Sequence, residues 1–78
     1  MWIRTQNKRR IINSDQIIDI FVDNTGTKIM AETIIDTHFH FALGEYKDRD
    51  TCLKVIEQLL VSMESMMTRF EMPLGGQV

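Results

Sequence analysis

The residues best suited to chemistry in this sequence form one short string, Asp36-Thr37-His38-Phe39-His40. If the string is a β-strand, Asp36, His38 and His40 share one face, with successive members about 6.5–7 Å apart. Two imidazoles and one carboxylate are ligands that zinc and other divalent ions accept. The pattern therefore offers a candidate metal site, either adventitious or shared between subunits.

The same string also has a plainer interpretation, in which these polar residues cover the outside of a strand whose inward face carries Phe39, Phe41 and Leu43. The string is similar to the D-x-H-x-H strand of amidohydrolase barrels, and that similarity would imply a metal-dependent hydrolase. Such enzymes draw further ligands from a barrel of about 250 residues, and a chain of 78 residues cannot supply one. We expect a polar face, and a hydrolase is the third alternative for function.

Other sequence patterns of catalysis or phosphate binding are missing. The sequence has no G-x-x-x-x-G-K, no G-x-G-x-x-G and no G-x-S-x-G, which are the strings that cradle phosphates or present a nucleophilic serine. Cys52 lies on the apolar seam of a predicted helix with no histidine near it in sequence, so we expect a core cysteine. We therefore predict no catalytic residue, no cofactor and no enzymatic activity.

Basic residues gather at the start of the chain. Arg4, Lys8, Arg9 and Arg10 are four of its nine lysines and arginines. The indole of Trp2 could stack on an aromatic base, provided that Trp2 is exposed. The guanidinium groups of Arg4, Arg9 and Arg10 could then donate paired hydrogen bonds to a phosphate. Alternatively, Trp2 packs in the core and the arginines pair with nearby carboxylates. We expect this second arrangement.

Composition excludes several classes of protein. The formal net charge is −2, so binding to nucleic acid is not expected. No apolar run approaches the ~20 residues of a membrane span, so no membrane partner is expected. The polar, basic stretch from 2 to 10 does not look like a secretory leader. A lone cysteine suits a reducing compartment, and we expect a cytoplasmic protein.

The elements that position these residues follow from the hydrophobic pattern. Period-two alternation and turn residues predict short strands at 2–5, 10–13, 16–23, 28–35 and 37–43. The predicted fold is a single α+β domain over residues 1–78. It is a small antiparallel β-meander of four to five strands, about residues 2–46, packed by one long C-terminal helix, about residues 48–70.

The predicted helix begins at an N-cap, Asp48, and ends before Pro73. Its apolar residues recur at steps of four and three from Cys52 to Phe70. Such a helix is roughly 34 Å long, whereas strands span only ~17–20 Å. Either a C-terminal turn folds back over the sheet, or the overhanging end is covered by a partner, most simply a second copy. The candidate interface residues are Leu60, Met63, Met66, Met67, Phe70 and Met72.

Three short segments, M-W-I-R-T-Q-N-K at 1–8, L-G-E-Y at 43–46 and F-E-M-P at 70–73, occur in order around the amphipathic helix. Together they resemble a family of very short uncharacterised proteins from Gram-positive bacteria and their phages. That family typically starts M-W-I-R-S-Q-D-K, so Thr5 and Asn7 replace serine and aspartate here. Cys52 stands where the family has alanine, which implies a small buried residue. The resemblance implies a β-meander followed by one helix, and a mobile-element context without an assigned activity.

Two hypotheses for function follow. The first is a small non-enzymatic binding module of phage or mobile-element origin that forms a homo-oligomer and acts by binding a host protein. The alternative is an oligomeric small-ligand binder that sequesters a nucleotide or a nucleotide-derived immune signal as a counter-defence, using Arg4, Arg9 and Arg10 between subunits.

Overall fold

The first strand of the protein is paired with segments from both ends of the chain. The computed structural model describes residues 1–35 and 39–78. Strand β1 (Trp2–Arg4) pairs antiparallel with β2 (Ile11–Asn13) and parallel with β6 (Arg69–Glu71), which gives a sheet of order β2-β1-β6. The β1–β2 hairpin was predicted and is confirmed. Strand β6 lies where the sequence predicted the end of the helix.

The second sheet consists of β3 (Ile17–Val22), β4 (Lys28–Thr33) and β5 (His40–Glu45), all antiparallel in the order β3-β4-β5. Between the pairs Ile29↔Gly44 and Met30↔Ala42, β5 holds one extra residue, a β-bulge. A Cβ at Gly44 would lie 3.0 Å from the hydroxyl of Tyr46. A glycine is needed there because the chain approaches that ring closely.

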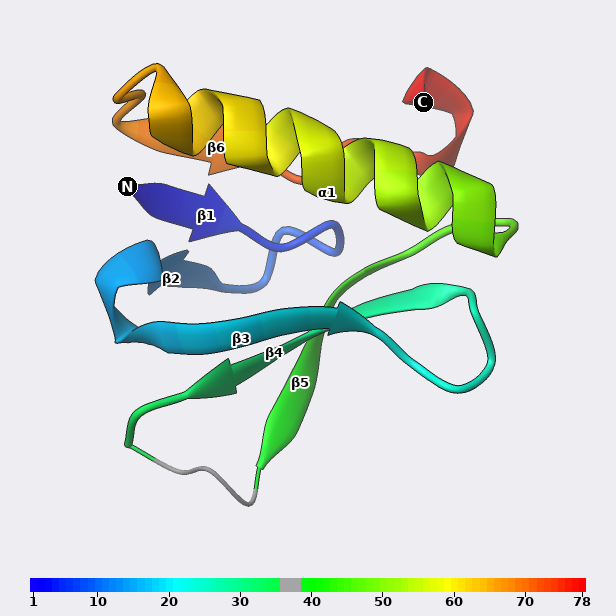
Figure 1. The fold of residues 1–78 in the computed structure, drawn as a ribbon, viewed down its shortest axis with the longest axis horizontal. Coiled ribbons are helices and arrows are strands. Elements are labelled where there is room, and N and C mark those ends of the chain that lie inside the picture. The colour runs from blue at the N-terminus through cyan, green and yellow to red at the C-terminus, as the bar shows by residue number, and fades with distance from the viewer. Residues whose placement is uncertain (36–38) are drawn as a thin grey trace.

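The helix α1 (Arg49–Glu64) begins where the sequence predicted. The Asp48 carboxylate accepts hydrogen bonds from the Thr51 backbone N–H at 2.8 Å and from the Thr51 hydroxyl at 2.6 Å. These bonds to Thr51 hold the pKa of Asp48 below its usual value. The helix contacts β3 and β4 and buries Thr51, Cys52, Val55 and Leu59. Figure 1 shows it running along one side of the molecule, with β3-β4-β5 on the other.

The end of the helix corrects the prediction, because α1 stops at Glu64 and not near residue 70. The Met67 N–H donates to the Ser62 carbonyl and the Met66 N–H to the Met63 carbonyl, both at 3.1 Å. Met66 has φ 58°, so these two bonds form the left-handed cap that ends many helices. The 16 residues of α1 therefore span about 24 Å, and the chain turns back to form β6.

The predicted α+β class is confirmed, but the single meander is replaced by two three-stranded sheets. A 3₁₀ turn at Ser14–Gln16 separates β2 from β3, so the two strands lie in different sheets, and β6 pairs with the other edge of β1. Among the described residues, five strands lie within the predicted range of 2–46, and β6 is the sixth. Short 3₁₀ turns occur at Ser14–Gln16 and Gly75–Gln77. The shared core consists of Ile3, Ile29, Ala31, Phe41, Leu43, Tyr46, Cys52, Val55, Leu59 and Met72.

The two sheets and the C-terminal segment are joined at one point. The side-chain amide of Gln6 donates to the Glu45 carbonyl at 2.9 Å and to the Pro73 carbonyl at 3.2 Å, and its oxygen accepts from the Glu45 N–H at 2.8 Å. The Tyr46 hydroxyl also donates to the Pro73 carbonyl, at 2.8 Å. Segments 1–8, 43–46 and 70–73 therefore meet in space, where they connect elements of the fold.

Within the part of the chain that the structure describes, no helix combines the length and the apolar character needed to cross a bilayer.

Candidate functional site

The sheet β2-β1-β6 leaves one of its faces uncovered. Register fixes which residues share it: Trp2 lies between Asn13 and Arg69, and Arg4 lies between Ile11 and Glu71. The alternate residues Ile3, Ile12 and Phe70 point inward and contact the core. We call the six exposed-side residues the outer face: Trp2, Arg4, Ile11, Asn13, Arg69 and Glu71.

The outer face contains a shallow hollow of about 300 Å³, lined by Trp2, Arg4, Ile11 and residues 68–71. Trp2 is 51% exposed and Ile11 is 60% exposed. The expectation that Trp2 packs in the core is therefore wrong, because its strand turns Ile3 and not Trp2 toward the core. The indole instead forms part of the open lining of the hollow.

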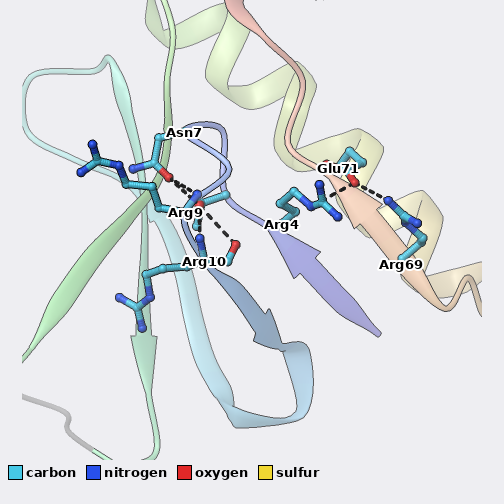
Figure 2. A network of polar contacts seen from close by, with 7 residues as sticks. Arg4, Asn7, Arg9, Arg10, Arg69 and Glu71 are labelled. Carbon is cyan, nitrogen blue, oxygen red and sulfur yellow. Dashed lines mark hydrogen bonds and ion pairs between the residues drawn. The ribbon is translucent and has the colours of Figure 1, made fainter.

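Two arginines converge on one carboxylate in this hollow. The Arg4 Nε lies 3.3 Å from the Glu71 Oε1, and the Arg69 guanidinium donates a short hydrogen bond to the same oxygen. Figure 2 shows the two guanidinium groups reaching Glu71 from either side. The hydrogen bond from Arg69 is the main reason that the pKa of Glu71 lies below its usual value, and the charges of Arg4, Arg69 and Lys8 lower it further.

The predicted set of Trp2, Arg4, Arg9 and Arg10 is divided by the structure. Trp2 and Arg4 share the outer face, but the Arg10 guanidinium lies 4.3 Å from the ring centre of Phe41 in the other sheet. Figure 2 shows Arg9 and Arg10 extending away from Arg4. Arg9 and Arg10 lie in the loop between β1 and β2, so they are not on the face of β1 that carries Trp2 and Arg4.

Arg69 is the functional candidate that the sequence analysis missed. The apolar spacing from Cys52 to Phe70 was interpreted as one helix, so Arg69 and Glu71 were not recognised as same-side residues of a strand. Their alternation around Phe70 was the available signal, although a run of three residues is too short to identify a strand.

Of the candidate metal residues Asp36, His38 and His40, the structure describes His40. Asp36 and His38 lie outside the described residues. His40 is exposed on β5, where its Nε2 lies 3.4 Å from the Glu32 Oε1 and its ring meets Phe21 edge-on, with ring centres 5.2 Å apart. Within 1–35 and 39–78, no group of three His, Cys, Asp or Glu residues is placed to hold a metal ion.

The inward face predicted for this strand is partly confirmed. Phe41 and Leu43 are buried in the core. Phe39 is exposed and stacks on Phe41 with ring centres 6.5 Å apart. Phe39 precedes β5, so the strand's alternation does not fix its orientation.

The predicted interface residues divide into two groups. Met72 is only 4% exposed, so its placement on an open surface was wrong, and Phe70 packs partly against the core. Both are turned inward because β6 folds back beside β1. The remaining four, Leu60, Met63, Met66 and Met67, are exposed at the C-terminal end of α1.

A second hollow, of about 170 Å³, lies beside that end of the helix. We call it the helix hollow; its lining is entirely apolar and consists of Ile20, Ile56, Leu59, Leu60 and Met63. Leu59 is buried and forms part of its floor, whereas Leu60 and Met63 are exposed at its rim. Strand β3 supplies Ile20, so the hollow lies between the helix and the edge of a sheet.

Cys52 is fully buried, as predicted for a core cysteine. Its Sγ lies 3.7 Å from the carbonyl of Gly26, and burial raises the pKa of its thiol. No buried side-chain nitrogen or oxygen in the described part of the chain lacks a hydrogen-bond partner. The two candidate sites are the hollow on the outer face and the helix hollow. Comparison of the chain with family models, curated proteins and solved structures gave no match.

Proposed function

We propose that this protein is a small non-enzymatic binding module whose first partner is a second copy of itself. The observation that carries the proposal is the group of large apolar side chains left exposed around the C-terminal end of α1, namely Leu60, Val61, Met63, Met66 and Met67. Leu60 and Met63 lie together at the rim of the helix hollow, and contiguous exposed apolar surface marks interaction sites in small proteins. Methionine adapts its shape to a partner more easily than branched residues do.

The small size of the protein supports burial of this exposed apolar surface by a partner. A chain of 78 residues has a small core, so burial of that surface would add materially to its stability.

The helix hollow suits a two-fold arrangement of two copies. In such a dimer, the rim residues Leu60 and Met63 of one protomer would enter the hollow of the other, and the reverse contact would follow from symmetry. Ile20 and Ile56 would then be covered from both sides.

The oligomeric state of two matched variants tests this proposal. Leu60→Glu places a charge at the rim of the helix hollow, whereas Leu53→Glu places it on the same helix outside the hollow, at nearly equal exposure (47% and 46%). We expect native mass spectrometry and light scattering to show a dimer for the unchanged protein and for Leu53→Glu, and a monomer for Leu60→Glu. An unchanged protein that is strictly monomeric at tens of micromolar would contradict the proposal.

The wider setting is part of the same proposal. A phage or mobile-element origin and a host protein as the eventual target rest on the sequence resemblance, and a reducing cytoplasm rests on the single free cysteine. Affinity capture with Leu60→Glu as the matched bait would separate partners that need the dimer from those that do not.

A second candidate function is binding of a small anionic ligand. It is favoured by one observation: an exposed tryptophan and two arginines, Arg4 and Arg69, share the outer face around an open hollow. Sequestration of a nucleotide or a nucleotide-derived signal would be one use of such a face.

A further inference from the structure

We propose that the outer face binds a small ligand in which a flat aromatic ring is joined to a phosphate or similar anion. The ring would stack on Trp2, and the anion would bind Arg4 and Arg69 in place of Glu71. This deepens the second candidate function and rests on it, but it does not depend on self-association.

The arginine pair provides the anion half of the site. Arg4 and Arg69 come from neighbouring strands, and both reach the same Glu71 oxygen. All three side chains are well exposed, at 42%, 66% and 40%, and exposed ion pairs contribute little stability. A phosphate offers several oxygens and satisfies two guanidinium groups more fully than one carboxylate does. Glu71 is therefore a weak internal occupant that such a ligand can displace.

The local charge favours an incoming anion. Arg4, Arg69 and Lys8 all lower the pKa of Glu71 through their charges, so three cations act on one carboxylate. The protein as a whole carries a formal charge of −2, which would repel a long polyanion. A small ligand with one anionic group is attracted by this local positive charge and does not extend over the acidic remainder of the surface, which would repel it.

Trp2 provides the ring half of the site. Trp2 and Arg4 are two residues apart on β1, so their side chains leave the same face about 6.5–7 Å from each other. Ile11 of β2 adds an exposed apolar neighbour. The hollow of about 300 Å³ is at the lower end of the ~300–1,000 Å³ typical of small-ligand sites. A small ligand with one aromatic ring system and one anionic group matches this end of the range.

The experiment uses the fluorescence of Trp2, the only tryptophan in the chain. Stacking of an aromatic ring on the indole is expected to quench its emission, so we titrate with AMP, adenosine and ribose 5-phosphate separately. We expect saturable quenching by AMP. Adenosine should bind at least about tenfold more weakly, because a charge-assisted pair of hydrogen bonds is lost. Ribose 5-phosphate competes with AMP but does not quench by itself.

Four variants identify the residues. Arg4→Ala and Arg69→Ala should each weaken AMP binding about tenfold or more. Glu71→Gln should strengthen it several-fold, because the internal competitor loses its charge while the strand is kept; a purely structural role of Glu71 would not predict this gain. Arg9→Ala should leave binding unchanged, because Arg9 extends away from the outer face. Circular dichroism checks that each variant is folded.

Several results would overturn the proposal. These are the absence of saturable quenching at millimolar AMP, equal binding of adenosine, or weaker binding by Glu71→Gln. A Trp2 emission that changes on dilution without ligand would show that a second copy covers the outer face. If a short single-stranded DNA binds more tightly than AMP and its affinity falls steeply with salt, the face is a nucleic-acid interface and not a small-ligand site. AMP binding by Leu60→Glu at unchanged affinity separates this site from self-association.

Discussion

Tyr46 places its hydroxyl inside the protein, where it donates to the Pro73 carbonyl. Burial of the phenol, with a smaller contribution from the nearby Cys52 thiol, raises its pKa from 10.0 to about 12. The folded protein therefore holds the phenolic proton more tightly than the unfolded chain does. This contribution to stability is complete below pH 10 and is lost as the pH rises through 12.

Alkaline titration tests this residue directly, because Tyr46 is the only tyrosine in the chain. We expect the tyrosinate absorbance to rise near pH 12, or earlier and together with unfolding. The free energy of unfolding should fall by about 2 kcal/mol between pH 10 and pH 12. Tyr46→Phe should be less stable at neutral pH by about 1 kcal/mol, and it should lack this alkaline loss. Ionisation at pH 10 in a protein that stays folded would contradict the prediction.

Among the elements, the end of α1 shows a local conflict between residue type and backbone. Met66 occupies the left-handed position of the helix cap, which favours glycine, and its side chain is 87% exposed and contributes little packing within the protomer. The conformation is kept because the two cap hydrogen bonds and the return into β6 require it.

We therefore expect Met66→Gly to raise the free energy of unfolding by roughly 1 kcal/mol. Met66→Ala is the matched control, since alanine shortens the side chain but keeps the Cβ that the left-handed backbone disfavours. Its stability should stay within about 0.5 kcal/mol of the unchanged protein. Urea denaturation at low protein concentration measures both. A less stable Met66→Gly protein would show that the methionine side chain has a partner.

At the element scale, the sequence predicted what local pattern determines. Asp48 as an N-cap and the neighbouring antiparallel strands predicted at 16–23 and 28–35 are confirmed, because each depends on neighbours in the chain. The end of the helix was not predictable in this way. Apolar residues at Met63, Met66 and Phe70 continue a helical period, whereas the pairing of Phe70 with Ile3 depends on the distant strand β1.

The candidate site shows the same division. Trp2 and Arg4 were recognised from their residue types as part of a possible set, and β1 places both on one face because they are two residues apart. Arg69 joins them from the far end of the chain through parallel pairing, and period-two alternation over three residues cannot reveal that contact. The sequence also could not predict that Trp2 is exposed, because an indole suits a core and a binding face equally well.

At the scale of the whole molecule, Gln6 connects the β1–β2 loop, β5 and the C-terminal segment through three hydrogen bonds. We expect Gln6→Ala to lower the free energy of unfolding by about 1–3 kcal/mol, because all three hydrogen bonds are lost. The loss is not larger, because some of the former partners are partly exposed and bind water instead. Gln58→Ala on the exposed side of α1 is the control, with a change within about 0.5 kcal/mol. Chemical denaturation of both proteins measures the difference. Equal stability of the two would show that Gln6 does not hold the sheets together.

The parallel pairing of Trp2–Arg4 with Arg69–Glu71 also sets the order of events during synthesis. A ribosome adds about 5–20 residues each second, so roughly 3–13 seconds separate the translation of Trp2 from that of Arg69. During that interval the edge of β1 that later pairs with β6 is unpaired, and it can pair with another extended peptide, such as a second nascent chain on the same messenger RNA. A chain that ends before Arg69 lacks β6, so this edge of β1 stays unpaired. We expect such truncated chains to aggregate and to be degraded readily by proteases.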